Sequence, residues 1–296
     1  MLIQLERPQR GPRLPEWLRK PQRNVEADHD LKKMLRTRGL HTVCEEARCP
    51  NRNDCFARGA ATFMILGDVC SRSCGFCSVK TGRGTPLDQL FDEPEQVAEA
   101  AAHLKLRYVV ITSVNRDELP DGGANHFART IHAVRRRLPD SRIEVLTPDF
   151  KGDRRALGVV LDANPDTFNH NVETVPRLYR RVRPQADYQQ SLGMLRAARS
   201  CSSGVLIKSG FMVGLGETRD EVKRLLEDLL AHGVNVATIG QYLQPTRAHL
   251  PVEEYVHPEV FAEYEEYGER LGLRAVFSGP LVRSSYMAEM VSERAL

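Results

Sequence analysis

The chain has 296 residues, of which 41% are hydrophobic and 27% charged, a composition typical of a globular protein with a substantial core. The formal net charge of +3 at pH 7 lacks the strong basic excess of nucleic-acid-binding proteins, so no nucleic-acid partner is expected. No run of 18 or more apolar residues occurs, and the N-terminus has no apolar secretory stretch, so we expect no membrane association and a cytoplasmic location.

The first 60 residues are rich in Arg, Pro and Cys and contain no long periodic segment. Residues 1–23 carry six basic side chains against two acidic ones. Such a segment is either a solvated, loosely ordered leader or a docking arm for an acidic partner. Leu31 and Leu35 then predict one short helix before the first cysteines.

From residue 62 onward, strand-like apolar runs alternate with segments of helical periodicity. The expected strands are 62–69, 108–113, 143–146, 167–169, 205–213 and 236–242, with a short seventh at 274–277. A helix is expected to start near Asp92, where an Asp precedes a Pro in the first turn. The other expected helices are 125–138, 153–161, 188–199, 218–232 and 258–271.

Six strand-then-helix units in series predict parallel strands joined by right-handed crossovers. The expected fold class is therefore α/β, as a partial (β/α)6 TIM-type barrel, with a doubly wound sheet as the alternative. We expect an N-terminal cysteine-bearing extension at 1–60, the barrel at 61–275 and a short C-terminal extension at 276–296. In either architecture the functional loops lie at the carboxyl ends of the strands.

Six of the seven cysteines form two triads. Cys44, Cys49 and Cys55 are separated by four and five residues; Cys70, Cys74 and Cys77 are separated by three and two. In a cytosolic chain these thiols are expected to bind metal rather than form a disulfide framework. The seventh, Cys201, stands alone and is expected to be a small buried hydrophobe.

The second triad occupies the first strand-to-helix loop, and its spacing matches the signature of the radical S-adenosylmethionine superfamily, with Phe76 before the last cysteine. Three thiolates on a 4Fe-4S cluster leave one iron open, which the amine and carboxylate of S-adenosylmethionine can occupy. An electron from the cluster can then break the sulfonium C–S bond and release a 5′-deoxyadenosyl radical. A zinc knuckle needs a fourth Cys or His nearby, and none follows Cys77 at ordinary spacing.

The first triad, within Val-Cys-Glu-Glu-Ala-Arg-Cys-Pro-Asn, resembles the auxiliary-cluster motif of the lipoyl synthase family. The sequence Arg-Ser-Ser-Tyr at 283–286 is similar to that family's C-terminal motif, in which a serine supplies the fourth cluster ligand. Neighbouring residues of an extended segment point to opposite sides, so one serine should reach iron, and we expect Ser285. Asp54 and the linker 80–85 are atypical for the family. Further stretches resemble the family at 112–117, 121–124, 169–174, 181–184, 208–218 and 241–246.

The resemblance implies radical insertion of sulfur at C6 and C8 of an octanoyl-lysine, with two S-adenosylmethionine molecules consumed. It implies two 4Fe-4S clusters, one of which, the auxiliary cluster, is the sulfur donor. The implied partners are an octanoylated lipoyl carrier domain (a dehydrogenase E2 subunit or a glycine cleavage H-type protein), a reduced ferredoxin or flavodoxin-type donor, and an iron–sulfur repair carrier. These two carbons have no neighbouring group to assist proton loss, which is why a hydrogen-abstracting radical is needed.

Polar residues at the predicted strand ends are expected to bind the cofactor, although structural hydrogen bonds are the alternative for each. Arg183 could pair with the methionine carboxylate, and Glu173 could bind ribose hydroxyls. The full expected cofactor-binding set is Phe76, Thr112, Ser113, Asn171, Glu173, Arg183 and Lys208. Met64, Phe211 and Met212 are candidates for an apolar octanoyl channel, with core packing as the alternative.

Three other interpretations account for part of the pattern. Another radical sulfur-inserting enzyme would share the Cys70 triad but not both the Cys44 triad and the closing Arg-Ser-Ser-Tyr. A non-catalytic iron–sulfur carrier or scaffold explains the cysteines but not a barrel with glycine-lined strand ends. A zinc-stabilised nucleic-acid-binding module is the third, and metal analysis distinguishes it.

Overall fold

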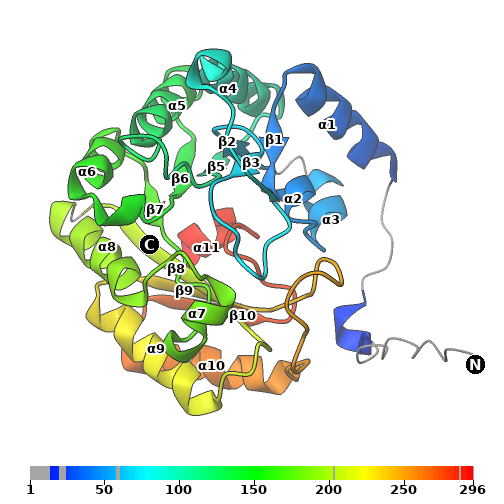
Figure 1. The fold of residues 1–296 in the computed structure, drawn as a ribbon, viewed down its shortest axis with the longest axis vertical. Coiled ribbons are helices and arrows are strands. Elements are labelled where there is room, and N and C mark those ends of the chain that lie inside the picture. Colours follow the sequence, from blue (N-terminus) through cyan, green and yellow to red (C-terminus); the bar gives the residue numbers. More distant parts are fainter. Residues whose placement is uncertain (1–13, 20–24, 58–60, 203, 287, 296) are drawn as a thin grey trace, which may run out of the picture.

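The computed structural model of the chain describes residues 14–19, 25–57, 61–202, 204–286 and 288–295. The basic segment 1–23 lies outside the described residues, apart from 14–19. Figure 1 shows strands lining an inner wall with helices arranged around its outside. Among the helices of the described ranges, none combines the length and apolarity needed to cross a bilayer.

The main sheet has eight strands in the order β1-β2-β5-β6-β7-β8-β9-β10. All neighbours are parallel except β1, which runs antiparallel to β2. β1 and β10 are the two ends of this order, so the barrel is partial, and the predicted fold class is confirmed. The strands are β1 (His41–Thr42), β2 (Thr62–Ile65), β5 (Tyr108–Ser113), β6 (Arg142–Leu146), β7 (Thr167–Asn169), β8 (Leu206–Val213), β9 (Val236–Gln241) and β10 (Ala275–Gly279).

Six helices follow six of the parallel strands and cover the outside of the sheet (Figure 1). Local signals set their ends: Asp153 caps α6, Thr218 forms a capping box with Glu221 in α9, and Gly272 ends α10 in the left-handed region. These helices are α4 (Glu93–His103), α5 (Ala124–Arg137), α6 (Arg154–Asp162), α8 (Tyr188–Cys201), α9 (Arg219–Ala231) and α10 (Pro258–Leu271).

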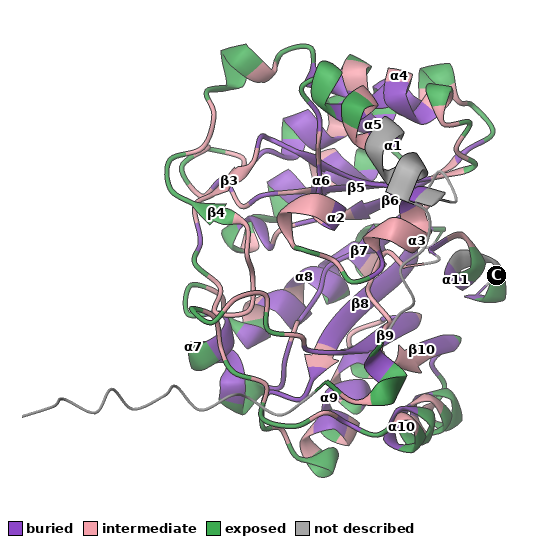
Figure 2. Cartoon of the chain, turned by 90° about the vertical axis from the view of Figure 1, so that its right-hand side faces the viewer, coloured by how far each residue is buried: buried purple, intermediate pink, exposed green. Residues whose placement is uncertain are grey.

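Short elements that the sequence did not predict surround the barrel. They are α2 (Val43–Glu46), α3 (Arg52–Ala57), β4 (Lys80–Thr81), α7 (Tyr179–Val182), α11 (Ala288–Ala295) and the 3-10 turns Glu16–Leu18, Leu87–Leu90, Phe150–Gly152 and Pro176–Leu178. The helix predicted around Leu31 and Leu35 is α1 (Val25–Thr37). α11 packs through Val291 and Ala295 against the first residues of β8, β9 and β10. Figure 2 shows β3, β4 and α7 on one side of the sheet and α11 on the other.

Two boundaries and the exposure of one cysteine differ from the sequence-based expectation. The strand expected at 62–69 stops at Ile65, because Leu66 and Gly67 have φ of 68° and 84°, and β3 (Val69–Cys70) then pairs with β4 instead. β10 continues to Gly279, past the expected barrel end at 275. Cys201 is exposed at the end of α8, so the prediction of a buried thiol was wrong.

Candidate active site

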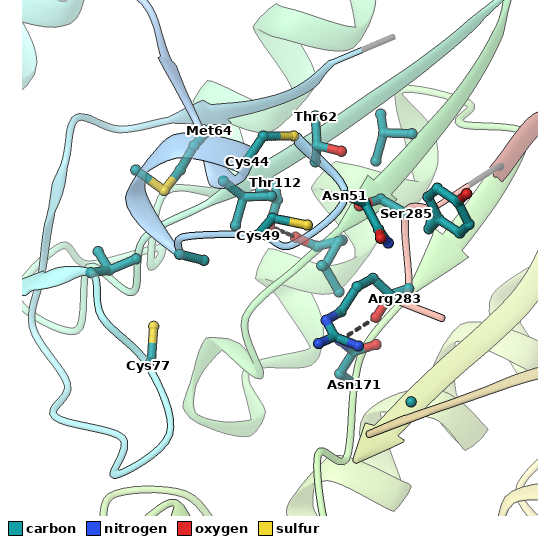
Figure 3. Close-up of a pocket in the computed structure, with 18 of the residues that line it drawn as sticks. Cys44, Cys49, Asn51, Thr62, Met64, Cys77, Thr112, Asn171, Arg283 and Ser285 are labelled. Carbon is teal, nitrogen blue, oxygen red and sulfur yellow. Dashed lines mark hydrogen bonds between the residues drawn. The ribbon is translucent and has the colours of Figure 1, made fainter. Parts of the chain in front are cut away.

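A cavity of about 750 Å³ runs through the barrel from the strand carboxyl ends. All six cysteines of the two triads line it, together with the C-terminal segment 282–286. Figure 3 shows Cys44 and Cys49 together, with Cys77 on one side of them and Asn51 and Ser285 on the other. The topology therefore brings the two triads and the C-terminal segment, about 200 positions further along the chain, to one cavity.

The Cys70 triad lies on the loop that joins β3 to β4, and backbone contacts hold this loop on several sides. The N–H groups of Arg72 and Asn115 donate to Cys70 Sγ at 3.4 and 3.3 Å. The Gly75 N–H donates to Val182 O at 2.9 Å, and the Leu250 N–H donates to Gly75 O at 3.0 Å. N–H donors aimed at a thiolate stabilise its charge and suit a ligated sulfur.

Arg72, between Cys70 and Cys74, anchors the loop to the barrel through two carboxylates. Its guanidinium donates to Asp117 at 2.7 and 2.9 Å and to Asp149 at 2.8 and 2.7 Å. Arg72 and Asp149 are both buried. Burial raises the pKa of Asp149, but the hydrogen bonds and charge of Arg72 outweigh it and hold that pKa well below the ordinary value. The pair is therefore charged at neutral pH.

The Cys44 triad lies on two short helices and the turn between them, with Cys44 in α2, Cys49 in the turn and Cys55 in α3. Thr42 Oγ1 caps α2 by accepting the Glu45 N–H at 3.3 Å, which orients Cys44 in the first turn. The Cys49 N–H donates to Cys44 O at 3.2 Å, and the Cys55 N–H donates to Asn51 O at 2.9 Å. A tight turn between α2 and α3 thus presents all three thiols to the cavity.

Burial raises the pKa of Cys44 and of Cys77 to about 12 and also raises that of Cys74. These thiols therefore keep their protons at neutral pH until a metal replaces them. Among the side chains that the structure describes, no three His, Cys, Asp or Glu residues converge where one metal ion would sit. Three thiols spread around a cavity suit the separate corners of a cluster.

The C-terminal segment 281–286 contacts the part of the chain that carries the Cys44 triad. Asn51 Nδ2 donates to Leu281 O at 2.7 Å, and the Tyr286 hydroxyl donates to Asp54 Oδ2 at 2.9 Å. Asp54, which is atypical in sequence, thus has a specific partner. The two extensions of the barrel, about 230 residues apart, meet at the place where Ser285 enters the cavity.

Two glycines on neighbouring strands make room for this segment. A Cβ at Gly240 of β9 would lie 2.2 Å from Val282 O, and one at Gly210 of β8 would lie 2.9 Å from Ser284 Oγ. At Gly240 the neighbour is backbone, so only glycine lets the segment lie this close to β9; at Gly210 a Cβ would also meet Thr238 Oγ1 at a separation under 3.0 Å, which Cβ atoms essentially never show. These two glycines, which lie within β8 and β9, therefore serve the approach of the chain's own C-terminal segment.

We expect Gly240→Ala to displace the segment 281–286. The added Cβ would meet the backbone carbonyl of Val282, which cannot move aside as a flexible side chain does. Overpacking of this kind costs about 1–3 kcal/mol. The variant should lose iron from the auxiliary site and lose sulfur insertion, and it should keep cleavage of S-adenosylmethionine; iron content and product analysis measure both. Gly193→Ala is the matched control, since a Cβ there meets nothing within 4 Å. Unchanged iron content in Gly240→Ala would contradict the expectation.

Polar residues at the strand ends face the cavity, and several have hydrogen-bonding atoms to spare. Six of the seven residues predicted to bind the cofactor line it: Phe76, Thr112, Ser113, Asn171, Glu173 and Arg183. Within the described residues, Ser113 Oγ and Arg183 Nε are buried without a partner. Because buried polar atoms are normally paired, these atoms indicate a polar ligand.

Glu173 and Arg183 stand together at this end of the cavity. Burial raises the pKa of Glu173, while the charge of Arg183 and a hydrogen bond from Asn171 limit the rise. Arg183 Nη1 donates to Asn171 O at 2.9 Å and to the Tyr179 hydroxyl at 3.3 Å. Thr112 is already engaged, since its hydroxyl donates to Leu146 O at 2.8 Å.

Lys208 does not line the cavity. It is fully buried below it, where its ammonium donates to Glu144 at 2.9 and 3.1 Å. Glu144 also accepts hydrogen bonds from Tyr108 and Asn169. A buried ion pair with this many partners is held in place, so its position contradicts the prediction that Lys208 contacts the cofactor.

Other cavity residues carry functional groups outside the expected cofactor-binding set. His170 Nδ1 lies 2.9 Å from Thr147 O, its Nε2 is buried without a partner in the described chain, and burial lowers its pKa to about 4. It is therefore a neutral imidazole that offers an acceptor to the cavity. Asn115, Thr238 and Arg283 also line it. Asn115 and Arg283 lie within family-like stretches of the sequence, whereas no sequence signal indicated Thr238.

Comparison with known proteins shows which families the chain is similar to. The model of the radical SAM superfamily matches residues 64–229, and that of the N-terminal domain of lipoyl synthase of the radical SAM family matches residues 3–49. A lipoyl synthase of Rubrobacter xylanophilus is 57% identical over 281 residues, covering 95% of this chain and 87% of the relative. A lipoyl synthase of Methylococcus capsulatus is 55% identical, covering 94% of this chain and 86% of the relative.

Solved structures agree on the fold. Methylornithine synthase superposes with a TM-score of 0.51 at 16% identity, covering 77% of this chain and 67% of that one. Coproporphyrinogen III oxidase of Escherichia coli, described as a radical SAM enzyme, gives 0.52 at 16% identity, covering 69% and 51%. At this identity the likeness concerns the partial barrel alone.

Proposed function

This chain belongs to the lipoyl synthase family of the radical S-adenosylmethionine superfamily, and from that premise we propose which of its residues hold its cofactors. It inserts sulfur at C6 and C8 of an octanoyl-lysine on a lipoyl carrier, using two 4Fe-4S clusters and S-adenosylmethionine. The observation that supports the assignment most is that both cysteine triads and Ser285 line one cavity.

Cys70, Cys74 and Cys77 hold the cluster that binds S-adenosylmethionine, which when bound supplies the hydrogen-abstracting radical. The anchored loop keeps the three thiols in place, and Arg72 ties that loop to the carboxyl ends of the neighbouring strands. Phe76, Thr112, Ser113, Asn171, Glu173 and Arg183 surround the cofactor. Of these, Ser113 and Arg183 offer unused donors, and Glu173 offers a carboxylate for hydroxyl or ammonium groups.

Cys44, Cys49, Cys55 and Ser285 hold the auxiliary cluster. Ser284 is engaged elsewhere, because its hydroxyl accepts a hydrogen bond from Asn171 Nδ2 at 2.7 Å, which favours Ser285 as the ligand. A serine oxygen is a weak match for iron beside three thiolates. Such a ligand suits a cluster that must come apart when it donates sulfur.

The octanoyl chain lies in the cavity between the two sites. Met64, Phe211 and Met212 all face it and supply apolar wall. Met64 and Phe211 are almost fully buried, which excludes water from the reacting carbons. A dry environment protects a carbon radical from side reactions during the time that it needs to reach sulfur.

We further propose the partners and the organisation of the chain. The carrier is an octanoylated dehydrogenase E2 lipoyl domain or a glycine cleavage H-type protein, the electron donor is a reduced ferredoxin or flavodoxin-type protein, and an iron–sulfur carrier rebuilds the consumed cluster. All seven cysteines are free thiols, which suits the cytoplasm. The chain divides into an N-terminal extension at 1–60, a barrel from 61 that includes β10, and a C-terminal extension beginning after Gly279.

Anaerobic reconstitution with iron and sulfide, followed by S-adenosylmethionine, a strong reductant and an octanoyl-lysine peptide, tests the assignment. We expect a peptide carrying two sulfurs and about two 5′-deoxyadenosines for each product, because each C–H bond needs one radical. Deoxyadenosine without sulfur on the peptide would favour another radical sulfur-inserting enzyme. No deoxyadenosine from protein with both clusters intact would favour an iron–sulfur carrier or scaffold.

A further inference from the structure

Asn171 connects the cofactor end of the cavity to the C-terminal segment. Its side-chain Nδ2 donates to Glu173 Oε1 at 3.1 Å and to Ser284 Oγ at 2.7 Å. Its backbone carbonyl accepts from Arg183 Nη1 at 2.9 Å. Asn171 therefore contacts Glu173 and Arg183, which are expected to surround the cofactor. It also contacts Ser284, the neighbour of Ser285, which faces the auxiliary site.

The contact between Asn171 and Ser284 is tightly packed. Both lie over Gly210, where an added Cβ would be 2.9 Å from Asn171 Oδ1 and 2.9 Å from Ser284 Oγ. Asn171 Oδ1 is itself buried without a hydrogen-bond partner in the described residues. The Asn171 side chain thus has one unused acceptor, Oδ1, while its Nδ2 donates to two partners. Such an amide can exchange hydrogen-bond partners when a polar ligand binds.

Ser285 lies between two side-chain tethers. On one side Ser284 is held by Asn171, and on the other Tyr286 donates to Asp54 at 2.9 Å. Because the peptide bond is planar and stiff, a shift of Ser284 changes where Ser285 can place its oxygen. Loss of the Asn171 contact removes one of these tethers and leaves the other.

We propose that Asn171 and Ser284 are positioning residues that couple occupancy of the S-adenosylmethionine site to the hold of Ser285 on the auxiliary cluster. The inference rests on the proposed function. A cofactor hydroxyl that accepts from Asn171 Nδ2 competes with Ser284 Oγ for that donor. Binding of the cofactor then frees Ser284 and loosens Ser285, so the auxiliary cluster becomes labile when the radical source is in place.

Hydrogen exchange of the reconstituted protein with and without S-adenosylhomocysteine, which lacks the sulfonium and is not cleaved, measures this coupling. In the unmodified protein we expect the ligand to speed amide exchange in 281–286, and release of auxiliary iron to a chelator, by about fivefold, the effect of losing one neutral hydrogen bond. In Ser284→Ala both rates should already be high and should not respond to the ligand. Ser278→Ala is the control, since this buried hydroxyl has no partner in the described chain, and it should respond as the unmodified protein does.

Two results would overturn the coupling alone. The first is that S-adenosylhomocysteine binds but leaves amide exchange in 281–286 unchanged, in a protein that makes the two-sulfur product. The second is that the Ser284→Ala variant keeps the full response to the ligand. Equilibrium dialysis establishes binding separately. If the reconstituted protein neither binds the ligand nor inserts sulfur, the proposed function fails, and the coupling fails with it.

Discussion

Replacing Cys74 by alanine is expected to reduce 5′-deoxyadenosine formation to background while the auxiliary cluster remains. Two thiolates cannot hold the cluster with one iron open to the cofactor, because the triad leaves no spare ligand at that loop. The Cys44 triad lies on a separate segment, made of α2, α3 and the turn between them, and keeps its own ligands. Quantifying deoxyadenosine by mass spectrometry, and the remaining cluster by iron content and electron paramagnetic resonance, checks both parts.

Cys49→Ala is the matched variant with the opposite pattern. It should still form deoxyadenosine, since the Cys70 loop and its anchor Arg72 do not depend on α2 for their ion pairs. It should place no sulfur on the octanoyl-lysine peptide, because the auxiliary cluster loses a ligand. If both variants lost both activities while remaining folded, the assignment of the two triads to separate clusters would fail.

Arg72→Ala is expected to lower the free energy of unfolding by about 3–5 kcal/mol at pH 7, the cost of removing one partner of a buried ion pair. Asp149 is fully buried and would lose both hydrogen bonds that Arg72 donates to it. Urea unfolding of the anaerobically purified protein measures the difference. The double variant Arg72→Ala, Asp149→Asn should cost less than the two single changes together, because it leaves no unpaired charge.

The pH dependence of this cost has a definite sign. In the unmodified protein the pKa of Asp149 lies below its unfolded value of about 3.9, so its contribution is present above that pH and is lost as pH falls through the folded pKa. Without Arg72, burial raises the pKa of Asp149 and the folded state takes up a proton more readily. The stability difference between the two proteins should therefore grow as pH rises from about 4. A cost that is constant between pH 5 and pH 8 would contradict the charged pair.

The parts of the site that the sequence predicted are those that depend on local spacing. The short intervals within each triad keep its three thiols on one short segment, a loop or a pair of short helices, independently of how the rest of the chain folds. Alternation of apolar runs and helical periods likewise predicts six β/α units, because side-chain periodicity follows directly from strand and helix geometry. The Asp-Glu-Pro run at 92–94 likewise predicted the start of α4, which begins at Glu93, because a Pro in the first turn is a local signal.

The partners of single side chains were decided only by the tertiary structure, because they join residues far apart in sequence. A strand position does not tell whether Lys208 faces a cofactor or a carboxylate on a neighbouring strand, and the register of β6, β7 and β8 determined that it pairs with Glu144. The role of Asp54 became clear only from its hydrogen bond with Tyr286, which lies 232 positions away in the sequence. The contact of the C-terminal segment with Gly210 and Gly240 also depends on the tertiary structure, since the chain must turn back after β10 to bring residues 281–286 against β9 and β8.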